Sequence, residues 1–298
     1  MSSQVTAAII AAIVSGITLI VTSVAQWLSR RGTRRDLKEQ REHLTERGTL
    51  TEQRIRTLNE RFATAAGQLG SDKPPEVRLA GVYAMAGLAD DWEENRQTCF
   101  DVLCGYLRMP YEPDPGDEAP AKKRLAFEAS REVRHTVIRV ITAHLKAGAA
   151  VSWQGLNLDF TGAVFDGGDF RDAVFSGGGV GFNMAKFTGG KVRFATAKFT
   201  GAEVSFEGAR FSGGVVGFTV AKFTGSNVSF GAAKFTGGEV DFTTAEFSGG
   251  TVSFGAKFSG GTVSFDGALN WSVPPAFPWT DTPPPGVKLP KKEDQSQA

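Results

Sequence analysis

Hydrophobic positions recur at a nearly fixed interval between Leu158 and Leu269. Phenylalanine first falls every five residues, and then at intervals that alternate between seven and five residues. A small or aliphatic residue precedes almost every one of them by two positions. These phenylalanines are Phe160, Phe165, Phe170, Phe175, Phe182, Phe187, Phe194, Phe199, Phe206, Phe211, Phe218, Phe223, Phe230, Phe235, Phe242 and Phe247. So short an interval predicts a repeat architecture.

The same pattern predicts short β-strands. Residues two positions apart point to the same side of an extended chain, whereas an amphipathic helix repeats its apolar residues at three and four positions. In the unit that begins at Ala197, we expect Ala197 and Phe199 to point inward and Lys198 and Thr200 to point outward. With Leu269 as the last of twenty inward centres, we expect five coils of four sides, filled by phenylalanine rings that stack from coil to coil.

Pairs of extra residues lengthen alternate corners of the predicted coils. They are Gly190-Lys191, Ala202-Glu203, Gly214-Val215, Ser226-Asn227, Gly238-Glu239, Gly250-Thr251 and Gly261-Thr262. We expect these pairs to form bulged corners, so that a regular coil has 24 residues. Glycine tolerates backbone angles that other residues avoid, and we therefore expect the glycine positions to form the corners.

The tandem units resemble the pentapeptide-repeat family, which is built from A-x-L/F-x-x units. The resemblance covers about 110 residues and implies a right-handed quadrilateral parallel β-helix. In addition, Gly67–Ser71 and Val77–Ala84 are similar to a helical module that precedes the repeats in membrane-anchored bacterial members. This second resemblance implies helical hairpins and no known chemistry. The expected fold class is α+β multidomain, with a transmembrane helix, a small all-α module and a β-solenoid.

An uncharged apolar run extends from Val5 to Leu28. Its length is enough to cross a bilayer as a helix. Trp27 stands at its end, four arginines follow between positions 30 and 35, and no charged side chain precedes it. Because positive charge favours the cytoplasmic side, we expect a single-pass cell-membrane protein with its N-terminus outside and most of the chain in the cytoplasm. A cleaved signal peptide, the alternative, would carry its charges before the apolar run.

Composition shifts divide the chain into six expected segments. They are a transmembrane anchor at 1–29, a helical stalk and module at 30–110, a proline-rich linker at 111–121, a helix at 122–149, the β-solenoid at 150–270, and an aromatic cap and disordered tail at 271–298. We expect Gly48 to break the stalk and a second helix to begin near Thr49. Leucine spacing in the stalk is compatible with a coiled coil or with a helix packed on its own domain.

Sequence motifs for catalysis are absent. There is no phosphate-binding loop, nucleophile elbow or zinc-ligand spacing, so we expect a non-enzymatic protein without cofactor, metal or catalytic residues. Cys99 and Cys104 are expected to be reduced, part-buried thiols, and His43, His135 and His144 to be surface or packing residues. A formal net charge of +1 gives no case for nucleic acid as a partner.

The outward position before phenylalanine is basic in several successive coils. On one side these residues are Lys186, Arg210, Lys234 and Lys257, which we name the basic stripe. The opposite side has Lys198, Lys222 and Glu246. Two interpretations of the basic stripe remain open. It is either a column that keeps the repeat soluble and protects its edges, or an interaction stripe for an acidic partner or anionic lipid.

These features favour a membrane-anchored scaffold or protein-interaction module with an unnamed protein partner, and they are compatible with a homo-oligomer. The alternative is a DNA-mimicking protein that protects gyrase, as known among pentapeptide-repeat proteins. Mimicry requires an acidic column, but ten acidic residues stand against nine basic ones between Leu158 and Leu269. A third reading, an ice-binding surface of threonines, is disfavoured by the lysines beside them.

Overall fold

The structure is a computed structural model that describes residues 2–280 and 282–291. For residues 2–14, 17, 28, 30–37 and 39 it describes the backbone alone. The chain divides at Glu60 and Arg61 into two compact units. The first unit consists of most of helix α1 (Ser2–Gln68), and the second contains the remaining helices and all the strands.

Helix α1 continues without a break through Gly48, so the predicted break is wrong. One glycine inside a helix costs only about 1 kcal/mol, which is too little to end a helix of this length. The Thr49 hydroxyl donates to the carbonyl of Glu46 at 2.8 Å, and the Thr51 hydroxyl donates to that of Arg47 at 2.8 Å. Both threonines therefore bond back into the helix and do not cap a new one.

The predicted transmembrane anchor at 1–29 is corrected by the structure. Among the residues whose side chains are described, no helix is apolar over enough of its length to cross a membrane. A span requires roughly 20 predominantly apolar residues in succession. The described part of the run is short and contains the polar residues Ser15, Thr18, Thr22, Ser23 and Gln26. The expected single-pass membrane localisation, with its N-terminus outside, depended on this anchor and is therefore not supported either.

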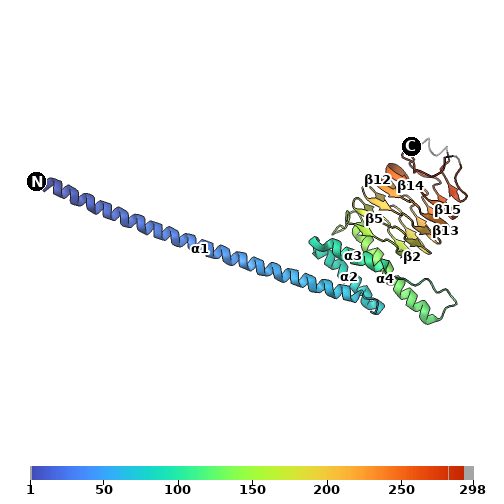
Figure 1. The fold of residues 1–298 in the computed structure, drawn as a ribbon, viewed down its shortest axis with the longest axis horizontal. Coiled ribbons are helices and arrows are strands. Elements are labelled where there is room, and N and C mark those ends of the chain that lie inside the picture. Colours follow the sequence, from blue (N-terminus) through green and yellow to red (C-terminus); the bar gives the residue numbers. More distant parts are fainter. Residues whose placement is uncertain (1, 281, 292–298) are drawn as a thin grey trace. The chain divides into compact units, whose positions relative to one another are not determined.

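Three further helices form an all-α module. They are α2 (Pro75–Asp91), α3 (Arg96–Arg108) and α4 (Ala121–Leu145), with a short 3-10 turn, η1, at Glu93–Asn95. Their apolar faces bury Val82, Leu88, Phe100, Leu103 and Val137 completely. Figure 1 shows α2, α3 and α4 at one end of the stacked strands, beside the first coil. Helix α4 contacts strand β3, and α3 contacts β1.

The strands form two parallel sheets. The first contains β1 (Leu158–Asp159), β4 (Val174–Phe175), β5 (Gly179–Gly181), β8 (Lys198–Phe199), β9 (Glu203–Ser205), β12 (Lys222–Ser229) and β14 (Glu246–Ser253). The second contains β2 (Val164–Phe165), β3 (Gly168–Asp169), β6 (Lys186–Phe187), β7 (Lys191–Arg193), β10 (Arg210–Phe211), β11 (Val215–Gly217), β13 (Lys234–Asp241), β15 (Lys257–Ser264) and β16 (Val287–Lys288). Each sheet covers two adjoining sides of the coils.

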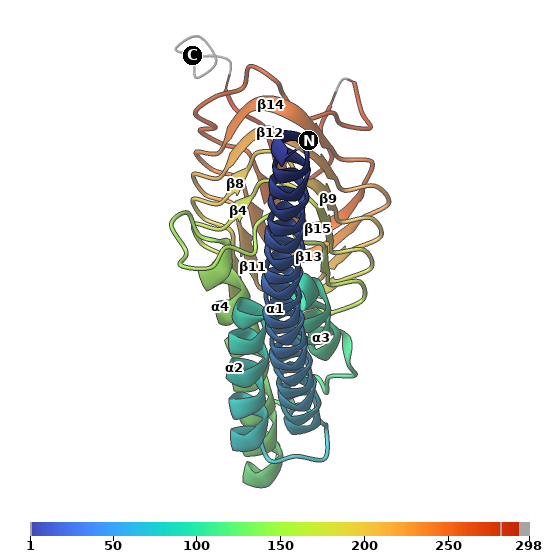
Figure 2. The same ribbon diagram turned by 90° about the vertical axis from the view of Figure 1, so that its left-hand side faces the viewer.

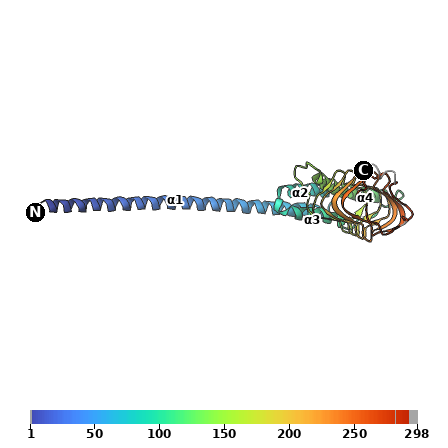
Figure 3. The same cartoon turned by 90° about the horizontal axis from the view of Figure 1, so that it is seen from above.

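Four stacks of phenylalanine rings fill the interior, as predicted. We name the four sides after them: side A is Phe160, Phe182, Phe206, Phe230 and Phe254; side B is Phe165, Phe187, Phe211, Phe235 and Phe258; side C is Phe170, Phe194, Phe218, Phe242 and Phe265; side D is Phe175, Phe199, Phe223 and Phe247. Ring centroids within a stack are 4.4–5.1 Å apart. The helical module is thus followed by a parallel β-solenoid of about five coils, which Figures 2 and 3 show from the side and from above.

The corners are of two kinds. Where residues are inserted, the strand register shifts, as between Phe223 and Asn227, which confirms the bulges. A Cβ added at Gly238, whose φ is +72°, would lie 2.6 Å from the carbonyl oxygen of Gly214. At the uninserted corners, however, left-handed residues are mostly not glycine: they are Asp172, Met184, Thr196, Val220, Ala232 and Thr244. The expectation that glycines form the corners therefore applies mainly to the bulged ones.

Aromatic side chains cover the C-terminal end of the stacks. Trp271 lies 5.3 Å from Phe247, Phe277 lies 5.5 Å from Phe254, and Trp279 lies 5.2 Å from Phe258, all measured between ring centroids. Leu269, predicted as the last inward centre, is instead 57% exposed, because Ala268 takes the inward position. Phe258 is only half-buried. The predicted disordered tail from Lys291 falls, from residue 292 on, outside the described residues.

Candidate functional site

The basic stripe lies on side B, on strands that are direct neighbours. Arg210 pairs in register with both Lys186 and Lys234, and Lys234 pairs with Lys257. All four side chains are exposed. Among the described residues, none of the ion pairs involves any of the four. Side chains one strand apart are roughly 5 Å apart, and stacked like charges destabilise a sheet, so the stripe is an unfavourable arrangement for the fold itself.

The opposite side, side D, balances part of its own charge. Lys222 pairs in register with Lys198 below it and Glu246 above it. The Lys222 ammonium donates to both carboxylate oxygens of Glu246, at 2.9 and 3.1 Å. Because the repeat permits such a pair, the uninterrupted series of cations on side B is a property of this sequence and not of the fold.

Hydroxyl groups beside the basic stripe are used within the solenoid. The hydroxyls of Ser212 and Thr236 each donate at 3.3 Å to the carbonyl oxygen of a phenylalanine in the preceding coil, Phe187 and Phe211 respectively. These bonds turn the hydroxyl groups toward the backbone. The charged side chains of the stripe are therefore the outward feature of side B.

A second concentration of polar groups lies where α4 meets the first coil, and its centre is Asp166. The Tyr111 hydroxyl donates to Asp166 Oδ2 at 2.7 Å, and His135 Nε2 lies 3.1 Å from Oδ1. Arg131 Nη2 donates to the backbone carbonyl of Asp166 at 3.3 Å. Burial alone would raise the pKa of Asp166, but the hydrogen bonds from His135 and Tyr111 and the charge of Arg131 outweigh it and lower that pKa.

Arg134 continues this network into the protein. Its Nη2 donates to the carbonyl oxygens of Leu107 and Val164, both at 2.8 Å, and so joins the end of α3 to strand β2. Its guanidinium carbon lies 4.3 Å from the centroid of the Tyr111 ring, a cation–π contact. Tyr111 begins the predicted linker at 111–121, so the start of that segment is held against the solenoid.

Trp153 connects the helices to the first coil at a separate point. Its ring is fully buried and stacks on the His144 ring, with centroids 3.9 Å apart. The Trp153 indole nitrogen donates to Asp90 Oδ1 at 2.9 Å, and His144 Nε2 lies 3.1 Å from Asp90 Oδ2. His144 is thus a packing residue, as expected. His135, in contrast, belongs to the polar network around Asp166.

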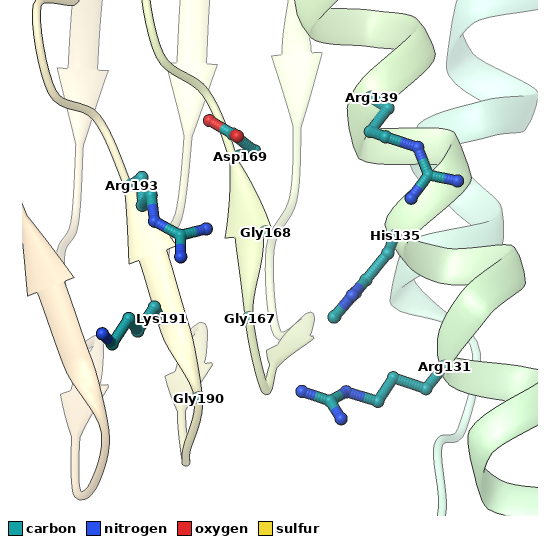
Figure 4. A pocket seen from close by; sticks show the side chains of 9 residues that line it. All are labelled: Arg131, His135, Arg139, Gly167, Gly168, Asp169, Gly190, Lys191 and Arg193. Atoms are coloured by element: carbon teal, nitrogen blue, oxygen red, sulfur yellow. The ribbon is translucent and has the colours of Figure 1, made fainter.

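An open pocket adjoins the Asp166 network. Its volume is about 480 Å³, and it lies between α4 and the corner that joins sides B and C (Figure 4). Its lining residues are Arg131, His135, Arg139, Gly167, Gly168, Asp169, Gly190, Lys191 and Arg193. The sequence predicted neither the pocket nor the network, because their polar residues do not recur from coil to coil and so form no pattern. One signal was available: coil one lacks the insertion that every later coil has at this corner.

Metal-binding and reactive thiol chemistry find no support in the described part of the chain. No cluster of three or more His, Cys, Asp or Glu side chains suits a metal ion there. Cys99 and Cys104 are both free and buried. Burial raises the pKa of Cys99 to about 11 and also raises that of Cys104. Since the thiolate is the reactive form, both side chains are inert packing residues at neutral pH.

Comparisons with protein-family models, with curated proteins and with solved structures gave no match to this chain. The resemblance to pentapeptide repeats therefore rests on the repeat itself. The β-solenoid of about five coils with regular phenylalanine stacking is consistent with that fold.

Proposed function

We propose that this chain is a non-enzymatic interaction module whose solenoid binds an acidic protein partner through side B. The fold supports this proposal because its interior is filled by stacked rings, and a filled, rigid column offers surfaces for docking. A β-solenoid of this kind is consistent with a scaffold or interaction module. Relatedness to pentapeptide-repeat proteins is part of the same proposal.

The observation that carries the proposal is the unpaired basic stripe. Four cations follow one another on neighbouring strands, and none of them forms an ion pair with another residue that the structure describes. Side D shows that a glutamate at the equivalent position is compatible with the same coil. A surface that keeps repelling charges together favours a partner that supplies the opposite charge. The same stripe argues against the DNA-mimicking alternative, which needs an acidic column.

The test is a comparative affinity purification from the native cell with the full chain as bait. Arg210→Glu combined with Lys234→Glu reverses the centre of the stripe. Lys198→Glu combined with Lys288→Glu causes the same change in net charge at exposed positions on sides D and C. Lys222 is unsuitable for this control, because its reversal would place two acids beside each other at Glu246.

We expect an acidic protein to be enriched with the unchanged chain and with the control variant, and to be lost with the stripe variant. Retention by both variants, or an equal loss with both, would contradict the proposal and leave the stripe as a solubilising column. Binding of only anionic vesicles, abolished by the stripe variant, would replace the protein partner by a lipid surface.

A further inference from the structure

We propose that the pocket between α4 and the first bulged corner is a binding site for a phosphoryl group carried by a small molecule. This site is separate from the basic stripe, because none of the stripe residues lines the pocket. The phosphoryl site and the proposed interaction function can therefore be tested independently of each other.

The shape of the pocket follows from a difference between the first two coils. Two residues, Asp166 and Gly167, connect Phe165 to Gly168 in the first coil. In the second coil four residues connect Phe187 to Val192, although the same positions are paired in register. The longer corner at Gly190 and Lys191 therefore has no equal below it, and α4 closes the other side of the resulting hollow.

The floor of the pocket requires glycine. Gly167 and Gly168 have φ values of +144° and +146°, which disfavour any side chain. A Cβ at Gly167 would lie 3.0 Å from His135 Cε1, and one at Gly168 would lie 3.0 Å from Ile138 Cδ1. Two glycines in succession thus let α4 approach the strand closely while the space beside His135 stays open.

The walls of the pocket carry an excess of positive charge. Four of the lining residues are permanently cationic, and the one lining carboxylate belongs to Asp169. That carboxylate already accepts hydrogen bonds from Nε and Nη2 of Arg171, at 2.9 and 2.6 Å. Among the described residues, Lys191 and Arg193 form no ion pair. The nearby acids Asp166 and Glu132 pair with Arg131 and Arg139, at 3.4 and 2.6 Å, so the excess positive charge is that of Lys191 and Arg193.

The donors reach the pocket from opposite walls. In Figure 4 the side chains of Arg131 and His135 extend from α4 toward the strand of Gly167 and Gly168, and the Arg193 guanidinium extends toward it from β7. The Lys191 ammonium points away from α4 and contributes at the rim. Arg131 Nε is buried, and the 3.4 Å ion pair with Asp166 Oδ2 leaves it without a hydrogen-bond acceptor in the described structure.

This arrangement suits a phosphoryl group better than a carboxylate. A phosphoryl group presents three oxygens in different directions, so donors on α4 and β7 can bind it together, and guanidinium groups bind such oxygens in pairs. A volume of about 480 Å³ exceeds that of the anion alone and falls in the range of small-molecule sites. The ligand class is therefore a phosphate monoester whose organic part occupies the rest of the pocket.

Titration calorimetry with the full chain tests this assignment, with inorganic phosphate and phenyl phosphate as the probes. Arg193→Gln removes an exposed donor that forms no ion pair among the described residues, and we expect it to weaken binding of both probes about tenfold. Arg193→Lys keeps the charge but not the paired donors, and an intermediate loss is expected. Lys198→Gln is the control: it removes an exposed cation of β8, on side D and in the other sheet, and should change the affinity less than about twofold.

Arg131→Gln, on the opposite wall, provides a second variant and should also weaken binding, because the side chain of Arg131 extends toward the strand of Gly167 and Gly168. The assignment is overturned if neither probe binds the unchanged chain, if Arg193→Gln leaves the affinity unaltered, or if Lys198→Gln weakens it equally. Sedimentation with phosphatidic acid vesicles separates the two sources of a phosphoryl group. Binding to vesicles without binding to free phosphate or phenyl phosphate would contradict the small-molecule ligand. Thermal melting of each variant verifies that the fold is retained.

Discussion

The middle coils of the solenoid and the junction with α4 are stabilised in different ways. In the middle coils the same contact recurs: Phe206 stacks on Phe182 below and on Phe230 above, at 4.7 and 4.6 Å. At the junction, Asp166 alone connects Tyr111, His135 and Arg131. The repeated contact is apolar and is encoded by a period, whereas the junction depends on individual polar side chains. A change in the first region removes one of many equal contacts, and a change in the second removes a contact that has no substitute.

The largest effect is expected from Phe206→Ala in the middle coils. Its ring is fully buried between two others, so the change leaves a cavity and should lower the free energy of unfolding by about 3–5 kcal/mol. Lys198→Ala, an exposed side chain on side D, should change it by less than about 0.5 kcal/mol. Urea denaturation of the full chain measures both. Equal losses would mean that the inward and outward positions are assigned incorrectly.

Gly238→Ala should be the next most costly change. It combines a left-handed φ with a Cβ only 2.6 Å from the carbonyl oxygen of Gly214, and we expect a loss of about 2–4 kcal/mol. Gly208, at an uninserted corner, also has a positive φ, but its Cβ would approach nothing closer than Met184 Cγ at 3.5 Å. Gly208→Ala should therefore cost only about 1–2 kcal/mol. The reverse order would contradict the distinction between the two kinds of corner.

At the junction, Asp166→Asn should lower the free energy of unfolding by about 2–3 kcal/mol at neutral pH, since hydrogen bonds to a charged acceptor are weakened. The folded-state pKa of Asp166 is lowered, so the carboxylate's contribution is complete above the unfolded value of about 3.9 and is lost as pH falls through the folded value. The gap between the two proteins should hold from pH 7 to about 5 and shrink in more acidic buffer.

Asp117→Asn is the matched control for that change, because Asp117 is exposed and lies outside the network. It should alter the free energy of unfolding by less than about 0.5 kcal/mol at any of these pH values. A gap between the unchanged chain and Asp166→Asn that widened toward low pH would show that the carboxylate destabilises the junction.

Ser226→Ala gives the smallest of the four expected effects. The buried Ser226 hydroxyl oxygen accepts hydrogen bonds from the backbone nitrogens of Gly201 and Ala202, at 3.0 and 2.9 Å. Losing both should cost about 1–2 kcal/mol, and the exposed Ser248→Ala serves as the reference. If Ser226→Ala were as harmless as Ser248→Ala in urea denaturation, the corner would not depend on this hydroxyl.

The sequence predicted the repeated part of the molecule well, because each inward position is specified many times. The four ring stacks, the bulged corners and the register of the basic stripe all follow from the spacing of phenylalanine. Two predictions for α1 were wrong. No membrane span is found among its described residues, which include polar ones from Ser15 to Gln26, and the helix continues through Gly48. The sequence also did not predict the junction, since no repeated spacing relates Asp166 to His135. Only the absent insertion after Phe165 pointed there.

Binding of a fluorescent glutamate-rich peptide to the full chain tests the central claim most directly. Fluorescence anisotropy over a range of salt concentrations should show affinity that falls as salt rises, because exposed charges are screened. The account predicts that Arg210→Glu with Lys234→Glu abolishes this binding, while Lys198→Glu with Lys288→Glu, with the same net charge, retains it. Equal behaviour of the two variants would contradict the claim that side B is the docking surface.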